Sequence, residues 1–245
     1  MDRMLYVAMS GAKETLIAQA NASNNLANAN TSGFLADLNQ FRSMPVFGSG
    51  HPTRVYAMDE RPGTDFDHGS IQYTGRNLDV AVQQGGWIAV QARDGSEAYS
   101  RRGDLRVDEN GLLATGNGLP VMGNGGPIAI PPFEKIDIGS DGTVSIRPLG
   151  ANADQLAVID RIKLVAPAFD EMKKGDDGLF RLNGGEAEED PTQRVISGAL
   201  MASNVNVVNE MVDMIELSRR FELQVKMMKT AEENAGAAAS IVRPV

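Results

Sequence analysis

Few side chains in this sequence could do chemistry. It contains two histidines, His51 and His68, and no cysteine. Without cysteine, disulfides, thiolate zinc sites and cysteine nucleophiles are all excluded. Neither histidine lies three or four residues from a second plausible set of ligands, so we predict that both are exposed loop residues and that the chain has no metal site.

Two further patterns could suggest a ligand site. Asp137 and Asp141 flank a predicted turn, but a calcium loop needs further carboxylates and a closing glutamate, so we predict that both cap the turn. The stretch GNGLPVMGNGGP, residues 116–127, lacks the Gly-Lys-Ser/Thr of a phosphate loop and is interpreted as hairpin turns. We expect no catalytic residue and no cofactor; paired carboxylates on a sheet face, or a Ser/His/Asp triad assembled in space, stay open alternatives.

The charge of the chain argues against nucleic acid as a partner. Its net charge is -9 and its pI about 4.8, whereas phosphate binding needs clustered Lys and Arg. Residues 176–190 are strongly acidic, which indicates a solvated loop or, as the alternative, a docking site for a basic partner. Residues 15–36 carry no charge but are too polar for a membrane span, and the first residues lack the pattern of a cleaved secretory signal.

Any functional residues must be positioned by the elements of the fold, and helices are predicted near both ends of the chain. Residues that recur at alternating intervals of four and three positions predict one helix face near the N-terminus. A second such set, more apolar, predicts a helix face over about residues 203–234. The first face consists of Leu5, Met9, Ala12, Leu16, Gln19, Ser23 and Leu26. The second consists of Val207, Met211, Met214, Ser218, Phe221, Val225 and Met228. We predict that Gly33 ends the first helix just past its last turn.

Short alternating runs and glycine-rich turns fill the middle of the chain. They predict β-strands, with hairpin turns at Asn110-Gly111 and Asp141-Gly142. The fold class is therefore α+β: long N- and C-terminal helices packed as a coiled-coil-like hairpin, with an all-β central domain. The expected ranges are 1–34 for the first helix, 35–75 for an extended connector that contains Pro45, Pro52 and Pro62, 76–195 for the β-domain, and 196–245 for the last helix.

Three motifs, in order, resemble the bacterial flagellar axial proteins. The stretch YVAMSGAKETLIAQANASNNLANANTSGF resembles their N-terminal signature, GRNLDVAVQQGGWIAVQ with YSRRGDLRVDENGLLATGNGLPVMG resembles the central domain of rod and hook subunits, and SNVNVVNEMVDMIELSRRFELQVKMMK resembles their C-terminal helix. The length, the opening MDRMLYVAMSGAK and the connector SMPVFGSG are most similar to proximal rod members of the family. Trp87, where the family usually has Phe, is a departure.

This resemblance implies a structural subunit of the proximal rod, which crosses the periplasm as part of the drive shaft for motility. It implies no enzyme activity. The implied partners are copies of the chain, homologous rod subunits and the flagellar type III export apparatus, which would export the chain without a cleaved signal peptide. No nucleic acid and no direct membrane insertion are expected. A distal rod or other axial subunit, or an enzyme or binding β-domain with oligomerisation helices, are the alternatives.

An assembly interface would include the apolar positions of both helices. The expected interface residues are Leu5, Met9, Ala12, Leu16, Asn24, Asn25, Leu26, Asn28, Gly33, Val207, Met211, Met214, Phe221, Val225 and Met228. The asparagines are unusual, because asparagine is a mediocre helix former. We hypothesise that Asn24, Asn25, Asn28 and Asn30 satisfy backbone groups across subunits; the alternative is that they only cap a helix end within one chain.

Overall fold

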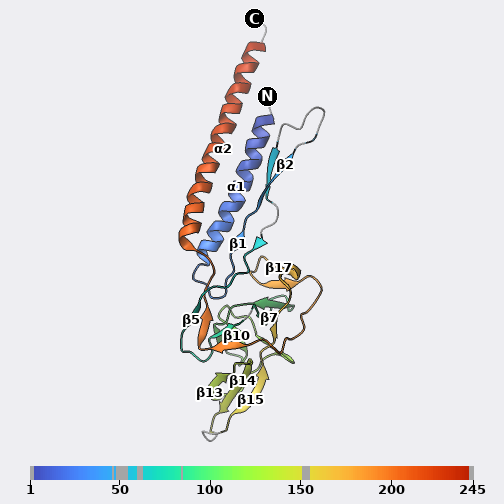
Figure 1. Cartoon of the computed structure of the whole chain (residues 1–245), viewed down its shortest axis with the longest axis vertical. Coiled ribbons are helices and arrows are strands. Elements are labelled where there is room, and N and C mark those ends of the chain that lie inside the picture. Colours follow the sequence, from blue (N-terminus) through green and yellow to red (C-terminus); the bar gives the residue numbers. More distant parts are fainter. Residues whose placement is uncertain are drawn as a thin grey trace. The chain divides into compact units, whose positions relative to one another are not determined.

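A computed structural model describes residues 3–45, 47, 55–59, 63–83, 85–150 and 155–242 of the chain. The chain forms two compact units. The first, called here the helical unit, consists of Met1–Ala29, Ala36–Asp65 and Val205–Val245. The second, called the β unit, consists of Asn30–Leu35 and Phe66–Asn204. The fold is therefore α+β, with a helix near each end of the chain and a β-rich region between the two helices in the sequence (Figure 1).

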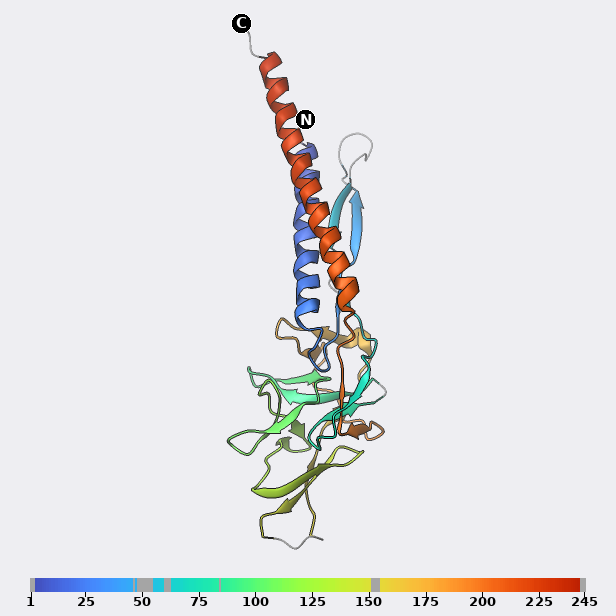
Figure 2. The ribbon, with the colours of Figure 1, turned by 90° about the vertical axis from the view of Figure 1, so that its left-hand side faces the viewer.

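Two antiparallel helices dominate the helical unit. Helix α1 spans Arg3–Ala27 and helix α2 spans Val207–Val242, and they lie side by side in both views of the ribbon (Figures 1 and 2). Small residues let them approach closely. A Cβ on Gly11 of α1 would lie only 2.9 Å from the Nε2 atom of Gln224 on α2. Ala18 and Ala22 of α1 pack against α2 in a small apolar cluster.

A β-hairpin completes the helical unit. Strand β2 (Phe41–Pro45) pairs antiparallel with β3 (Val55–Asp59), and β3 packs on α1. Two short strands, β1 (Asp37–Leu38) and β4 (Gly63–Thr64), also pair. The sequence predicts an extended connector over residues 35–75, and within this range the structure forms the strand pairs β1–β4 and β2–β3. Pro52 and Pro62 of this range lie outside the described residues, and Pro45 is the last residue of β2.

Antiparallel pairs build the β unit. Its largest sheet has the order β16-β7-β8-β18-β17, with bounds Leu164–Val165, Trp87–Gln91, Glu97–Ser100, Phe180–Leu182 and Met172–Lys174, and η1 (Phe169–Glu171) precedes β17. A three-stranded sheet follows the order β13 (Phe133–Ile138), β14 (Thr143–Pro148), β15 (Ala157–Arg161). The two-stranded pairs are β9 (Leu105–Val107) with β10 (Leu113–Thr115), β11 (Met122–Gly123) with β12 (Gly126–Pro127), β6 (Val80–Val82) with β19 (Val195–Ser197), and β5 (Ile71–Tyr73) with β20 (Ala199–Met201).

The two predicted hairpin turns are confirmed. Gly111, between β9 and β10, has φ +78, and Gly142, between β13 and β14, has φ +86, a left-handed conformation that glycine adopts without strain. The prediction that Asp141 caps its turn is also confirmed, because its carboxylate accepts hydrogen bonds from the Thr143 N–H and hydroxyl. The same prediction for Asp137 is wrong: this residue lies within β13 and pairs with Lys135.

Two clusters fill the core of the β unit. The larger is aliphatic and contains Val80, Ile88, Leu105 and Ile146 among many others. The smaller is aromatic and is centred on Trp87, Tyr99 and Phe180, and Leu35 from the short N-terminal segment of the unit joins it. Burial of these side chains is the main driving force for the unit. Residues 30–35 therefore belong to the β unit, and Leu35 to its core, although they follow the first helix closely in sequence.

Candidate assembly surface

The buried face of α1 differs from the predicted face by about one residue. The buried residues of α1 are Ala8, Ala12, Glu14, Thr15, Ala18, Ala22 and Asn25. Of the predicted face, Ala12 is buried and Leu5 and Leu26 are partly buried, whereas Met9 and Leu16 are 51% and 49% exposed. The buried residues are mainly small because small side chains allow close approach of the helices, whereas the large apolar side chains of Met9 and Leu16 are about half exposed.

On α2 too, the predicted face is only partly buried. Met214, Phe221 and Met228 are partly buried, whereas Val207, Met211 and Val225 are exposed. Leu217 and Ala231, which the prediction did not include, are the most buried apolar residues of the helix. The inward positions Met214, Leu217, Phe221, Gln224, Met228 and Ala231 alternate by three and four.

The helical unit consequently leaves many apolar side chains exposed. They lie on both helices and on the hairpin. On α1 they are Met4, Tyr6, Met9, Leu16 and Ile17; on α2 they are Val207, Val208, Met211, Val212, Ile215, Leu223, Val225, Met227 and Ile241; around the hairpin they are Leu38, Phe41, Met44, Phe47, Val55 and Met58. Single exposed apolar residues are ordinary, but a concentration of this size is typical of an interaction surface.

Asn25 is the one asparagine of the cluster that is fully buried. It is 2% exposed, and its Nδ2 donates to the Asp37 carbonyl at 2.9 Å and to Glu210 Oε1 at 3.0 Å. Its Oδ1 accepts from the Asp37 N–H at 2.9 Å. The amide thus joins α1, β1 and α2 within one chain. The hypothesis that Asn25 bonds to another subunit is therefore not needed to explain its hydrogen bonds.

The position of Glu210 beside Asn25 changes the pKa of its carboxylate. Loss of solvent raises its pKa above the ordinary range, the hydrogen bond from Asn25 works in the opposite direction, and the nearby charge of Asp213 raises it further. Asn24 and Asn30, in contrast, are exposed, and Asn28 donates to the Asn24 carbonyl at 2.9 Å. A role for Asn24, Asn28 and Asn30 between subunits stays a prediction.

Gly33 does not end α1, contrary to the prediction. The helix stops at Ala27, six residues earlier. Gly33 does have the predicted left-handed backbone, with φ +68, but the reason is packing: a Cβ there would lie 2.3 Å from the carbonyl carbon of Arg101. Its N–H donates to the Met201 carbonyl at 2.8 Å. Gly33, in the segment that follows the helix, is therefore packed tightly against the rest of the β unit.

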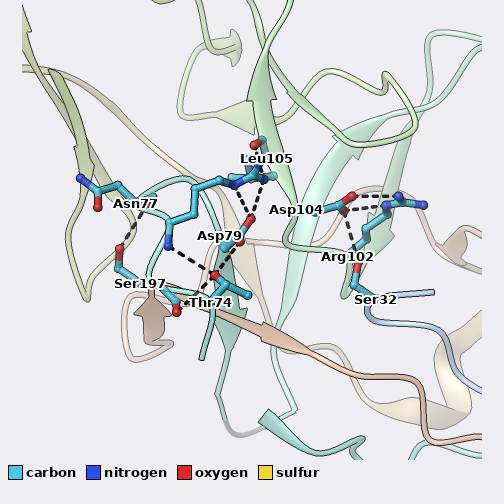
Figure 3. Close-up of polar contacts among 10 residues, drawn as sticks. Ser32, Thr74, Asn77, Asp79, Arg102, Asp104, Leu105 and Ser197 are labelled. Atoms are coloured by element: carbon cyan, nitrogen blue, oxygen red, sulfur yellow. Dashed lines mark hydrogen bonds and ion pairs between the residues drawn. The ribbon is translucent and has the colours of Figure 1, made fainter. Parts of the chain in front are cut away.

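Polar contacts beside Gly33 link the N-terminal sequence motif to the central one (Figure 3). Ser32 donates to Asp104 at 3.3 Å, and Asp104 also pairs with Arg102, whose Nη2 lies 2.8 Å away. A second group joins Thr74 to Asp79 at 2.6 Å. Asp79 also pairs with Arg76. Each of the two aspartates therefore binds one arginine and one hydroxyl, which is the arrangement of a satisfied structural network rather than of an acid–base pair.

A second arginine of this region, Arg101, is buried without a carboxylate. It is 1% exposed, and its guanidinium carbon lies 4.4 Å from the centre of the Trp87 ring. Nη1 donates to the Phe66 carbonyl and to His68 Nδ1, both at 3.1 Å, while Nε and Nη2 have no hydrogen-bond partner among the described residues. Burial lowers the pKa of Arg101 to about 10. His68 is exposed, as predicted, but it bonds to this buried cation; His51 lies outside the described residues.

No site for a metal or a membrane emerges from the part of the chain that is described. No group of three or more His, Asp or Glu residues there could hold a metal ion. None of the described helices combines the length and the apolar character needed to cross a bilayer. In the acidic stretch, Asp177 pairs with Arg181 and Glu189 pairs with Arg161, so part of its charge is used within the β unit.

Comparisons with known proteins point in one direction. A family model described as flagella basal body rod protein matches residues 5–34, one described as flagellar hook protein FlgE/F/G D1 domain matches residues 81–146, and one described as flagellar basal body rod FlgEFG protein C-terminal matches residues 196–241. The chain is 47% identical to the flagellar basal-body rod protein FlgF of Escherichia coli and 44% identical to that of Salmonella typhimurium, over 99% of each chain. It is 32% identical to the rod protein FlgG of Bacillus subtilis, over 95% of this chain and 96% of the relative.

Proposed function

Because the chain belongs to the family of flagellar basal-body rod proteins, we propose that it is a subunit of the proximal rod that polymerises through its terminal helices. Its relatives are structural rod proteins, so the chain is a structural protein and not an enzyme. Its task is then mechanical: the subunits must hold together while the rod transmits torque. Its function would therefore depend on the burial of apolar surface between chains and not on a chemical reaction.

One observation carries the proposal: many large apolar side chains of both helices lie outside the buried seam and are exposed. Met9 and Leu16 lie seven residues apart on one face of α1 and are about half exposed. Met211 and Ile215 lie four residues apart on α2 and are 52% and 56% exposed. A polymer would remove this surface from water. Full burial of an exposed side chain of this size stabilises by roughly 1.5–3 kcal/mol, so side chains that are already half buried would contribute about half of that.

We further propose that α1 and α2 pack as a coiled-coil-like pair. The inward positions of α2, from Met214 to Ala231, alternate by three and four, which is the heptad spacing. On α1 the facing residues are mainly alanines. A seam of this kind uses only one stripe of each helix, so the opposite stripes stay available for neighbouring subunits.

The partners follow from the family. We propose copies of this chain and homologous rod subunits as the direct neighbours, and the flagellar type III export apparatus as the route by which the chain leaves the cytoplasm without a cleaved signal peptide. The location would be the rod of the basal body, in the periplasmic space. The interface would include Asn24, Asn28 and the exposed members of the predicted set, with the hairpin β2–β3 beside them.

A distal rod subunit is the second candidate, because the chain is also similar over nearly its whole length to relatives named FlgG. Higher identity to relatives named FlgF favours the first candidate. Electron microscopy of basal bodies from a deletion strain separates the two. Loss of a proximal subunit should leave no rod beyond the point of loss, whereas loss of a distal subunit should leave a proximal stub.

The interface itself is tested by complementing that strain with variants. Leu16→Glu combined with Met211→Glu places charges on the exposed stripes without touching the buried seam, and we expect no rod and no motility. Val158→Glu, at a 68% exposed position of β15 in the β unit, is the control and should restore both. Normal rods from the double variant would contradict the proposal.

A further inference from the structure

The methionines of this chain are unevenly distributed. The sequence has twelve, of which Met1 lies outside the described residues. Among the others, the exposed ones all lie in the helical unit, and they are Met4, Met9, Met44, Met58, Met211 and Met227, between 39% and 52% exposed. The methionines of the β unit are less accessible: Met122 is partly buried, and Met172 and Met201 are 8% and 3% exposed.

This distribution confines the exposed, oxidisable sulfur of the described residues to the helical unit. The chain has no cysteine, so the methionine thioether is its only sulfur group. Hydrogen peroxide oxidises a thioether by oxygen transfer: the O–O bond breaks, an S–O bond forms, the sulfur is oxidised and the peroxide is reduced to water. The product, methionine sulfoxide, is polar where the thioether was apolar. Susceptibility follows exposure, so the helical unit should react first.

The exposed methionines lie among the other apolar side chains of the proposed interface. Met9 is seven residues from Leu16 on α1, and Met211 is four residues from Ile215 on α2, so each pair shares a helix face. Met44 and Met58 lie on the paired strands β2 and β3. Oxidation at these positions would insert a polar sulfoxide into a contact that depends on apolar burial.

We propose that the exposed methionines of the helical unit form a modification site at which peroxide prevents the free subunit from assembling. The inference rests on the proposed function, because it requires these side chains to be buried between chains in the polymer. A polar group buried there without a partner weakens each contact by about tenfold or more. Reduction of the sulfoxides by methionine sulfoxide reductase would restore the apolar surface and, with it, assembly.

The experiment treats the purified full-length chain with hydrogen peroxide, removes the oxidant, and measures two quantities. Peptide mass spectrometry gives the rate of sulfoxide formation at each methionine, and sedimentation at increasing concentration gives self-association. We expect Met9 and Met211 to oxidise faster than Met172 and Met201, and association to fall as the first pair is oxidised. Equal rates at all four positions, or unchanged association after oxidation of Met9 and Met211, would overturn the inference.

Matched variants separate oxidation from general damage. Leucine conserves the volume of methionine and does not oxidise, so a variant with the six exposed methionines replaced by leucine should associate normally and resist peroxide. A variant with Met172→Leu and Met201→Leu should remain as sensitive as the natural chain. If the untreated natural chain does not associate at any concentration, the proposed function fails as well; if it associates and the oxidised chain associates equally, only the present inference fails.

Discussion

Asn25 and Glu210 are joined by a hydrogen bond of 3.0 Å although they are 185 residues apart in the chain. The same amide forms two further bonds with the backbone of Asp37. The last turn of α1, the first turn of α2 and strand β1 therefore meet at one buried side chain. Ordering of α1 and α2 should depend on each other, because neither can leave without breaking this junction.

Asn25→Ala should accordingly destabilise the helical unit. The substitution removes three hydrogen bonds, those with the Asp37 N–H, the Asp37 carbonyl and the Glu210 carboxylate, and each such bond contributes about 0.5–1.5 kcal/mol. Denaturant unfolding followed by helical circular dichroism measures the effect. Asn24→Ala, one residue earlier and exposed, is the control, and its effect should stay within about 0.5 kcal/mol. Equal effects of the two substitutions would show that the junction contributes nothing.

Gly33→Ala should destabilise the β unit more than Gly75→Ala does. Both glycines have a left-handed backbone, with φ +68 and +74, so an alanine is strained by about 1 kcal/mol at either site. Only at Gly33 would the new Cβ also collide with the backbone at Arg101; at Gly75 nothing lies within 4 Å. The difference in stability between the two variants therefore measures how closely the chain packs around Gly33. Fluorescence of Trp87, the only tryptophan, reports unfolding of this unit, and identical midpoints would contradict the account.

Acidification should destabilise the β unit through His68. An arginine can only donate, so His68 Nδ1 must be the acceptor of the Arg101 bond, and this requires the neutral ring. Desolvation, and then the Arg101 charge, lower the pKa of His68 below 6.5, while Asp67 raises it. Because the folded-state pKa is the lower one, this stability is complete above the unfolded pKa and is lost as the pH falls through that value toward the folded pKa.

The measurement for this prediction is the unfolding midpoint, followed by Trp87 fluorescence, between about pH 7.5 and pH 5, where histidine is the main side chain to titrate. His68→Gln keeps an acceptor but removes the titration, so its midpoint should vary less with pH than that of the natural chain. His51→Gln removes the other histidine and shows how much of the slope belongs to that residue. A slope that survives His68→Gln unchanged would refute the assignment.

Glu97→Gln should destabilise the β unit by about 2–3 kcal/mol, because it leaves the ammonium of Lys163 without its charged partner. The Lys163 Nζ lies 2.8 Å from both carboxylate oxygens of Glu97, and the Glu97 side chain is only 4% exposed. Glu216→Gln, in an exposed pair with Arg220 on α2, is the contrasting variant, and its effect should be below about 0.5 kcal/mol. Thermal unfolding of both variants decides whether burial makes the difference.

The sequence predicts the terminal helices and the hairpin turns well, because their signals are local. A 3.6-residue period marks a helix wherever it lies, and Gly111 and Gly142 mark turns that need positive φ. The exact buried stripe of α1 was not predictable in this way. The pattern follows the largest apolar residues, Met9 and Leu16, whereas the helix pair buries the small residues Ala18 and Ala22 and leaves the large ones outside.

Other features lack a local signal altogether. The strand Phe41–Pro45 is exposed at every position, so it shows no alternation of apolar and polar residues and was interpreted as a connector. Arg101 belongs to a charged run that normally indicates a solvated loop, yet its neighbours in space bury it against Trp87. The concentration of asparagines marks the end of α1 in the sequence, but only the structure shows that Asn25 is the buried one.

Protection of Met211 in the assembled rod is the most direct test of the claim that the exposed helix faces are contacts between subunits. Because the natural chain has no cysteine, Met211→Cys gives a single thiol, and its reaction with a maleimide can be compared between the purified chain and isolated basal bodies. The account predicts rapid labelling of the free chain, protection in basal bodies, and labelling again once the basal bodies are denatured. Equal labelling of the free chain and of intact basal bodies would contradict it.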